Sequence, residues 1–410
     1  MGNQPQKLVP LFFKSLLNEN LMAKKTTEKP TKIERIDDLA SDVLSIINKS
    51  FKEFPDAGTF LNDANLVVDW VSTGCDILDL AISNRPNGGQ PTSKILEYNG
   101  LEASGKSLVA ATTLAQCQKR GGIAVLFDTE GAVGMLDFYR SIGLDTQKLI
   151  YIEKLRTLEE IYQATENIIV KYNESRSDKP LVIVIDSVSG ATTKKELEED
   201  YEKKGYATDK AIVNTGAMRR LPTLINGKNI LIILVQQLRA NMNAFGPAAD
   251  PFTTTGGTAI PYTASVRLRF KKMGQIKGKI NGIDTTVGER IQVQIIKNRV
   301  GPPRRKITFD VRYDSGIDNY GSWLTCLKEL GAIGQSGSSY TYKFVDEETG
   351  EEITKKFQSK DFKALLTENP ELKERIYKQI CDEYIMKYDT GEDEEELGID
   401  DIELEVTNED

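Results

Sequence analysis

A glycine-rich segment, Gly100-Leu101-Glu102-Ala103-Ser104-Gly105-Lys106-Ser107, has the spacing G-x-x-x-x-G-K-[ST]. The apolar run before it, Lys94–Tyr98, predicts a strand, and the stretch after it, Leu108–Gln118, predicts a helix. Such glycines let backbone N–H groups wrap around phosphates, and the helix N-terminus adds partial positive charge. We therefore expect this loop to bind the phosphates of ATP, with Lys106 on the β- and γ-phosphates and Ser107 on Mg²⁺. A chance match on a glycine turn would not explain the flanking strand and helix.

A second run, Leu181–Ile185, ends in a carboxylate, Asp186. Five consecutive apolar residues are typical of a buried parallel strand, and ligands of open α/β sheets bind at the carboxyl ends of such strands. Asp186 is therefore expected to hold Mg²⁺ together with Ser107. The alternative, a carboxylate that only caps the next helix, is disfavoured by the nearby phosphate loop.

Two further runs end in polar side chains at the same predicted edge. Gly122–Phe127 leads into Asp128-Thr129-Glu130, and Ile230–Val235 leads into Gln236-Gln237. Hydrolysis of ATP needs a group that polarises the attacking water, and Glu130 is expected to be that group. The amide of Gln237 can contact the γ-phosphate and report its presence to the glycine-rich segment that follows.

Composition limits the chemistry and the setting. The 410 residues include no histidine, and the four cysteines show no C-x-x-C spacing. This excludes histidine-based catalysis and histidine-containing zinc sites, argues against disulfides, and predicts a reducing, cytoplasmic setting. The longest apolar run, Ile230–Val235, is far shorter than the roughly 20 residues that cross a bilayer, so no membrane partner is expected.

The elements that must position these residues alternate between strand and helix from residue 66 to 318. This pattern predicts an α/β P-loop fold with a mainly parallel central sheet. The strands expected are Lys94–Tyr98, Ile123–Asp128, Leu181–Asp186 and Ile230–Val235. Three later runs leave no room for helices between them and predict antiparallel hairpins that finish the sheet: Ser265–Phe270, Ile291–Lys297 and Lys306–Tyr313.

Four segments lie outside this core. Residues 1–22 are expected to be a leader or extension, 23–65 an N-terminal arm with an amphipathic helix at Ile36–Phe54, and 319–388 a small α/β C-terminal domain. Residues 389–410 hold twelve acidic and no basic residues, and without them the net charge of −8 becomes +4. This tail either competes with nucleic acid for the basic body or is only a solubilising, disordered end.

The strand ends together resemble those of the bacterial RecA recombinases and their phage relatives of the UvsX type. Other segments agree in order and spacing: Ser72-Thr73-Gly74 with Leu78-Asp79, Asp186-Ser187-Val188, Ala217-Met218-Arg219, Thr253–Ala259 with Ala264–Leu268, Lys297-Asn298-Arg299 and Ser315–Gly321. The resemblance covers about residues 66–380. It implies a DNA-dependent ATPase that forms helical filaments on single-stranded DNA and catalyses homologous pairing and strand exchange in recombination and repair.

The resemblance also implies residue roles. The implied roles agree with those expected above for the phosphate loop, Asp186, Glu130 and Gln237. The resemblance also adds two site residues, Glu102 and Phe138. Phe138 stands where the family usually stacks a tyrosine on adenine. Lys297 and Arg299 would reach ATP from the neighbouring protomer, with Arg299 in place of a more usual lysine. Hydrolysis would then depend on filament assembly.

DNA contact is implied for two loops. The second, Arg239–Thr258, contains Arg239, two glycines (Gly256 and Gly257) that permit close approach, and Phe245, which can wedge between bases. Its stretch Ala248–Phe252 is longer than the bacterial pattern. The first, Glu196–Lys210, matches the family poorly, so the following helix offers better phosphate contacts, Arg219 and Arg220, unless these only form a solvated face.

One basic run is left with two interpretations. Lysines and arginines alternate along a predicted strand and its turn, at Arg267, Arg269, Lys271, Lys272, Lys277 and Lys279. Alternation puts Arg267, Arg269 and Lys271 on one face. They either assist DNA binding or keep an edge strand from aggregating.

The partners implied are single-stranded DNA, homologous double-stranded DNA recruited by residues 319–388, further copies of the chain bound through the N-terminal arm, and loading (mediator) and single-strand-binding proteins.

The main alternative is a hexameric RecA-fold helicase, which shares the phosphate loop. The threonine–glycine segment and the C-terminal domain argue against it. A small-molecule kinase would need a lid and an acceptor site, and a silent mediator would lack Glu130 or Lys106.

Overall fold

The computed structural model describes residues 32–50, 59, 67–131, 136–198, 206–241, 250–345 and 350–388. The chain divides into two compact units, Met1–Asn65 and Leu66–Asp410. The predicted Phe245, part of the first DNA loop (residues 199–205) and the acidic tail 389–410 lie outside the described residues.

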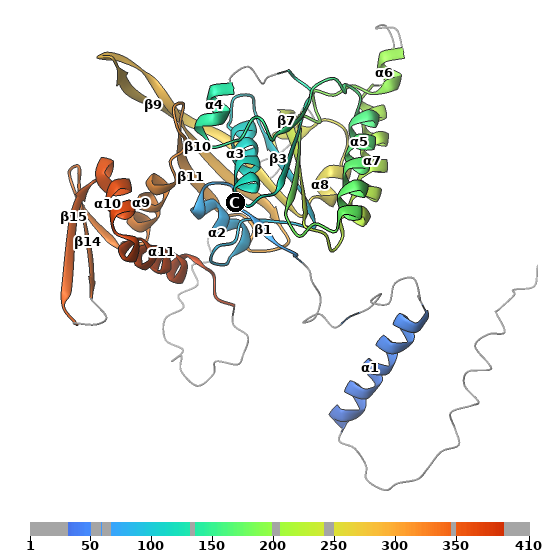
Figure 1. Cartoon of the computed structure of the whole chain (residues 1–410), viewed down its shortest axis with the longest axis horizontal. Helices are drawn as coiled ribbons and strands as arrows, with labels where there is room; N and C mark the ends of the chain where they lie inside the picture. Colours follow the sequence, from blue (N-terminus) through green and yellow to red (C-terminus); the bar gives the residue numbers. More distant parts are fainter. Residues whose placement is uncertain are drawn as a thin grey trace, which may run out of the picture. The chain divides into compact units, whose positions relative to one another are not determined.

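A large mixed sheet forms the centre of the second unit (Figure 1). Its strand order is β12-β11-β10-β9-β3-β7-β6-β4-β5, and β8 pairs with β7. The strands from β9 to β5 in this order run parallel to their neighbours, whereas β10, β11 and β12 are antiparallel. The bounds are β3 Lys94–Gly100, β4 Ile123–Asp128, β5 Ile150–Ile152, β6 Leu181–Asp186, β7 Ile230–Ala240, β8 Phe252–Thr254, β9 Val266–Ile280, β10 Ile283–Asn298, β11 Lys306–Arg312 and β12 Gly316–Ile317. The predicted α/β fold class is confirmed.

Helices cover both faces of this sheet, because its central strands are apolar on both sides. α2 (Asp76–Ser83) and α3 (Lys106–Lys119) pack on one face, in a core with Leu96, Val182 and Leu231. α5 (Leu158–Ser175) and α7 (Tyr206–Ile225) pack on the other. Shorter elements complete the layer: β1 Trp70–Val71, β2 Gln90–Pro91, α4 Leu136–Ser141, α6 Lys194–Glu198 and α8 Ala259–Thr263.

The C-terminal residues form a small three-stranded antiparallel sheet with helices. Their bounds are α9 Asn319–Glu329, β13 Ile333–Ser336, β14 Ser339–Val345, β15 Glu352–Gln358, the 3-10 helix Ser359–Asp361, α10 Phe362–Glu368 and α11 Pro370–Tyr384. Their core is continuous with that of the large sheet through Trp323, which is 2% exposed and whose indole N–H donates to Asp76 at 2.9 Å.

Strands β9 and β10 are longer than predicted. Only Val266–Phe270 of β9 pairs with β3, and only Gly288–Gln294 of β10 pairs with β11. Residues 277–286 pair only with each other and therefore continue as a free two-stranded ribbon, which projects from the sheet in Figure 1. The sequence analysis placed the end of the lysine-rich run, up to Lys279, in the turn. The turn itself is Asn281-Gly282, where both residues have positive φ (51° and 83°), as tight hairpins require.

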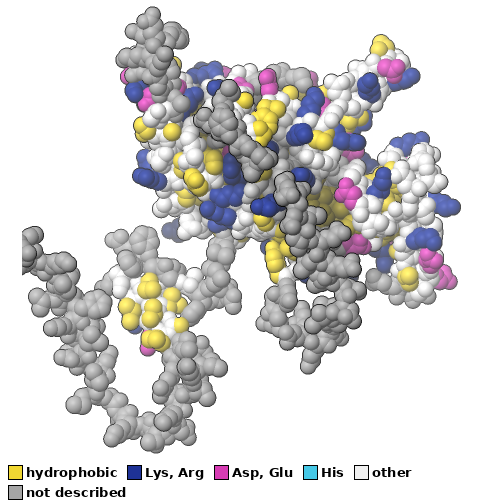
Figure 2. Space-filling model, turned by 180° about the vertical axis from the view of Figure 1, so that it is seen from behind, with side chains coloured by type: hydrophobic (Ala, Val, Ile, Leu, Met, Phe, Trp, Pro, Cys, Tyr) yellow, Lys and Arg dark blue, Asp and Glu magenta, His cyan; other side chains and the backbone are white. Residues whose placement is uncertain are grey.

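In the first unit the helix α1 covers Lys32–Ser50. It begins earlier than the predicted Ile36–Phe54, and residues 51–54 lie outside the described part. Four apolar side chains on this helix, Leu39, Val43, Ile46 and Ile47, are exposed and form the hydrophobic cluster visible in Figure 2.

All four cysteines are buried and free. Among the described helices, none combines the length and the hydropathy needed to cross a bilayer.

Candidate nucleotide-binding and catalytic site

The phosphate loop connects β3 to α3, and its glycines are required by close packing. Gly105 has a φ of +93°, and a Cβ there would lie 2.2 Å from the Cδ1 atom of Ile291. A Cβ on Gly100 would lie 2.7 Å from the backbone oxygen of Phe270. Any other residue at either position would push the loop away from the strands that support it.

The ammonium group of Lys106 is held over this loop. It donates to the backbone oxygen of Leu101 at 2.7 Å and to the hydroxyl of Ser104 at 3.4 Å. Burial lowers the pKa of Lys106, and the carboxylates of Asp186, Glu130 and Glu102 oppose that effect. A buried cation that meets only neutral oxygens in the loop fits a phosphate as its ligand.

Asp186 lies at the end of β6, in register with Asp128 at the end of β4. The pKa of Asp186 is raised to about 6, mainly by burial, while a hydrogen bond with Ser107 opposes the rise and the neighbouring Glu130 adds to it. A hydroxyl beside a desolvated carboxylate is an all-oxygen donor set of the kind that Mg²⁺ prefers. These two side chains therefore fit the metal that the motif implies.

Glu130 is brought together with residues from two other strand ends. The turn after β4 is shaped by Asp128, whose Oδ1 accepts from the N–H groups of Glu130 at 3.1 Å and Gly131 at 2.8 Å. The Oε1 atom of Glu130 then accepts from the Ser187 hydroxyl at 2.6 Å and from the Gln237 amide at 2.9 Å. The predicted water-activating residue and the predicted γ-phosphate sensor thus contact each other directly.

Ser187 was missed as a site residue, although it follows Asp186 immediately. The backbone N–H of Ser187 donates to the Thr129 hydroxyl at 3.0 Å, and that hydroxyl in turn donates to the backbone carbonyl oxygen of Ser187 at 2.8 Å. This pair fastens the turn after β4 to the turn after β6. The sequence signal was present in the quoted Asp186-Ser187-Val188, but the contact joins turns 58 residues apart.

A hollow of about 290 Å³ opens beside the phosphate loop. Phe138 lines it, as does Tyr139, whose ring centroid is 6.0 Å from that of Phe138. The opposite wall comes from Glu289, Ile291, Val311 and Tyr313. The antiparallel strands β10 and β11 supply this wall, about 150 residues or more along the chain from Phe138, so no local pattern indicated it. Its size and apolar lining suit a planar base.

Lys297 and Arg299 lie toward the other end of the sheet. Lys297 is paired in register with Arg267, and Arg267 with Glu97, which precedes the phosphate loop on β3. The Lys297 ammonium donates to the backbone oxygens of Pro261 (2.9 Å) and Tyr262 (2.7 Å). Their role at the ATP of a neighbouring protomer stays a prediction.

The residues predicted to bind DNA come from β7, from the segment after β8 and from α7. Arg239 is exposed near the end of β7. Gly256 and Gly257 pack against α7, where a Cβ on Gly256 would lie 2.4 Å from the Nδ2 atom of Asn214. On α7, Arg219 is exposed, whereas Arg220 forms an ion pair with Glu166 of α5. Their contact with DNA stays a prediction.

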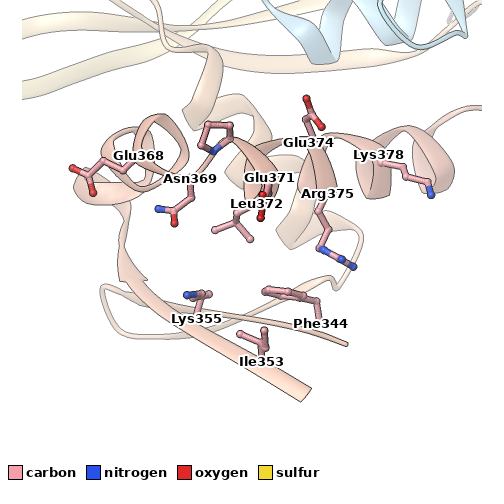
Figure 3. Close-up of a pocket in the computed structure, with 11 residues that line it drawn as sticks. Phe344, Ile353, Lys355, Glu368, Asn369, Glu371, Leu372, Glu374, Arg375 and Lys378 are labelled. Carbon is pink, nitrogen blue, oxygen red and sulfur yellow. The ribbon is translucent and has the colours of Figure 1, made fainter. Parts of the chain in front are cut away.

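A larger hollow, of about 800 Å³, lies in the C-terminal domain between α10–α11 and the strands β14 and β15 (Figure 3). Phe344 and Ile353 form its floor, and the Arg375 guanidinium lies 4.9 Å from the Phe344 ring centre. Charges of both signs line it: Lys355, Arg375, Lys378, Glu368, Glu371 and Glu374. Because these charges balance, the hollow by itself does not indicate an anion site.

The sequence was compared with known proteins. Residues 40–318 match the family model described as the RecA N-terminal domain. Protein RecA of Campylobacter jejuni (strain 81-176) is 32% identical over 313 residues, which cover 76% of this chain and 84% of that protein. Protein RecA of Zymomonas mobilis is 32% identical with 76% and 81% covered, and that of Brucella canis 31% with 77% and 80%. With its phosphate loop and the acids at its strand ends, the chain belongs to the RecA family.

Proposed function

We propose that this protein is an ATP-dependent DNA recombinase that assembles on single-stranded DNA and exchanges it for the matching strand of a duplex. The observation that carries the proposal is the contact between Glu130 and Gln237. It joins the expected centre of hydrolysis to β7, the strand that leads directly into the loop expected to bind DNA.

In this proposal each side chain has a defined task. Lys106 binds the phosphates of ATP, and Glu130 accepts a proton from the attacking water. Ser187 and Gln237 hold the Glu130 carboxylate in place through two donated hydrogen bonds. Mg²⁺, held by Ser107 and Asp186, would offset the charge of the phosphates.

Gln237 links the nucleotide to DNA binding. Its amide donates to Glu130, and its backbone N–H donates to the Ser189 hydroxyl at 3.0 Å. A γ-phosphate that attracts this amide would withdraw it from Glu130, freeing the base and shifting the end of β7. Trans-acting charges from Lys297 and Arg299 would complete the site only in an assembled filament.

The test is strand exchange with purified protein, ATP, Mg²⁺, a single strand and a labelled duplex of matching or unrelated sequence. We expect strand displacement only from the matching duplex. Strand displacement that ignores homology would support a helicase instead. ATP hydrolysis stimulated by DNA without any exchange, even after a loading protein is added, would contradict the proposal.

A further inference from the structure

The central strands β3, β9 and β10 carry a row of polar side chains on one face. Register pairs Asn99 of β3 with Arg269 of β9, and Arg269 with Gln294 of β10. Residues paired in this way point to the same face of a sheet. Because β9 lies between β3 and β10, it is not an edge strand where it carries Arg269. Protection against edge aggregation therefore does not explain this arginine.

The two arginines of this face, Arg267 and Arg269, are used differently. Arg267 donates to the carboxylate of Glu97, which is fully buried. Breaking this pair would leave an uncompensated charge in the core, so Arg267 is bound permanently. Its role is structural, and it offers no site for an incoming ligand.

Arg269 is anchored from inside and faces outward. Its Nε atom donates to the Oδ1 atom of Asn99 at 3.2 Å, and Asn99 is fully buried. Its two terminal nitrogens donate to the two carboxylate oxygens of Asp250, at 3.0 and 2.7 Å. A guanidinium binds the oxygens of a phosphate with the same two-pronged geometry.

Asp250 reaches this site from outside the sheet. Its side chain is 48% exposed, against 22% for that of Arg269. Burial by itself would raise the pKa of Asp250, but hydrogen bonds from Arg269 and from the N–H of Phe252 outweigh it and lower that pKa. The carboxylate is therefore charged. An ion pair this open to solvent is screened and weak, so another anion can replace it without disturbing Asn99.

The surroundings of the site indicate which anion that is. Asp250 lies two residues before β8, and the N–H of Asn241 donates to the backbone oxygen of Pro251 between them at 2.8 Å. These contacts close the base of the segment Arg239–Thr258, the predicted DNA loop. Lys271 follows Arg269 on the same face of β9 and is exposed. A polyanion that runs along this loop would meet Arg269 and then Lys271.

We propose that Arg269, with Asn99 behind it and Gln294 beside it, binds a backbone phosphate of single-stranded DNA, and that Asp250 occupies this site until DNA displaces it. The inference rests on the proposed function, since it assumes that the loop binds DNA. It adds a phosphate site on the sheet at the base of this loop, and a competitor for that site, Asp250, from the loop itself. Asp250 lies in the stretch that is longer than the bacterial pattern.

The test is a titration of a fluorescent single-stranded oligonucleotide at several salt concentrations, with a slowly hydrolysed ATP analogue present. Replacing the competitor (Asp250→Asn) should tighten binding about fivefold, which corresponds to the weak pair that it removes. Arg269→Gln should weaken binding about tenfold and reduce the salt slope by about 0.7, the loss of one phosphate contact. Arg269→Lys keeps the positive charge but cannot donate from two terminal nitrogens at once. Its affinity for the single strand should therefore lie between those of the other two variants.

The double variant decides the mechanism: with Arg269→Gln present, Asp250→Asn should give no gain. Asp284→Asn on the ribbon, which also removes one negative charge, is the matched control and should change affinity little. The site would be overturned if Asp250→Asn tightened DNA binding equally with and without Arg269→Gln, or if it left the affinity unchanged. Retained nucleotide binding shows that each variant is folded. If the wild-type protein binds no single strand, the proposed function fails as well; if it binds and the variants behave alike, only this site fails.

Discussion

At the residue scale, the site is defined by shared hydrogen bonds on one carboxylate. Glu130 receives one donor from β7 and one from the turn after β6, while Asp128 fixes the turn that presents it. A carboxylate held by two donors is kept in one orientation. The role of Glu130 as base is a prediction from its chemistry.

Glu130→Gln should therefore lower the DNA-stimulated rate of ATP hydrolysis by about 100-fold or more, because the amide cannot accept the proton of the attacking water. Binding of ATP and of single-stranded DNA should be unchanged. The measurement is steady-state phosphate release beside nucleotide and DNA titrations. Glu174→Gln, an exposed site on α5 that pairs with Lys171, is the control. A variant rate close to that of the control would remove Glu130 from this role.

Lys297 gives a second prediction at this scale. Its pKa is lowered to about 8, first by burial and then by the positive charges of Arg299 and Arg267. The ammonium is then charged below pH 8 and loses its proton as the pH rises through that value. If it acts on ATP in the neighbouring protomer, DNA-stimulated hydrolysis should fall between pH 7 and pH 9, where only about one Lys297 in ten is still charged.

The variant Lys297→Arg should keep its charge across this range and shift the fall in hydrolysis to higher pH. Comparing the pH profiles of the two proteins, each at saturating ATP and DNA, makes the test. Superimposable profiles would mean that another group controls the fall and that Lys297 does not act through its charge.

At the scale of elements, parallel strands gather the chemistry. β3, β4, β6 and β7 run the same way, so the residues that follow them meet at one edge although they are far apart in sequence. The antiparallel strands β10 and β11 close the other side of the nucleotide hollow through Ile291 and Val311. The helix α1 differs from these elements because its apolar side chains are exposed.

That exposed face predicts self-association. Ile46, 64% exposed, should become buried when copies assemble, so Ile46→Asp should reduce filament formation strongly while nucleotide binding by the core is retained. Light scattering with single-stranded DNA and a slowly hydrolysed ATP analogue measures the assembly. Ser41→Asp places the same charge on the opposite side of the helix and serves as the control. Equal assembly by both variants would contradict a role for this apolar face.

At the scale of the whole molecule, residues 319–388 and the large mixed sheet share one core. Trp323 is packed between them and donates to Asp76, so residues 319–388 are not loosely attached. The acidic residues of the tail, 389–410, lie outside the described part of the chain. Their number nevertheless sets the charge balance of the protein.

Deleting residues 389–410 removes twelve acidic residues and changes the net charge from −8 to +4. We expect tighter binding of double-stranded DNA and a steeper salt dependence, because the basic body then has no internal polyanion to compete with the phosphates. A duplex titration at several salt and magnesium concentrations measures both. An unchanged titration would leave the tail a role in solubility only.

The sequence alone predicted the phosphate loop, the site residues Asp186, Glu130 and Gln237, and the parallel strands that carry them. The strands are confirmed, and the roles of the side chains stay predictions. Each of these signals is local: a fixed spacing, an apolar run, or a polar residue at its end. The family followed from the same signals, and its model covers residues 40–318.

Only the tertiary structure decided which side chains meet. The contact of Glu130 with Ser187, the wall at Tyr313 and the pairing of Arg269 with Asp250 join residues from 19 to about 175 positions apart. The length of the β9–β10 ribbon was also missed, because its lysines suit a solvated strand as well as a turn. Such contacts depend on strand order and register, and no local pattern of residues encodes these.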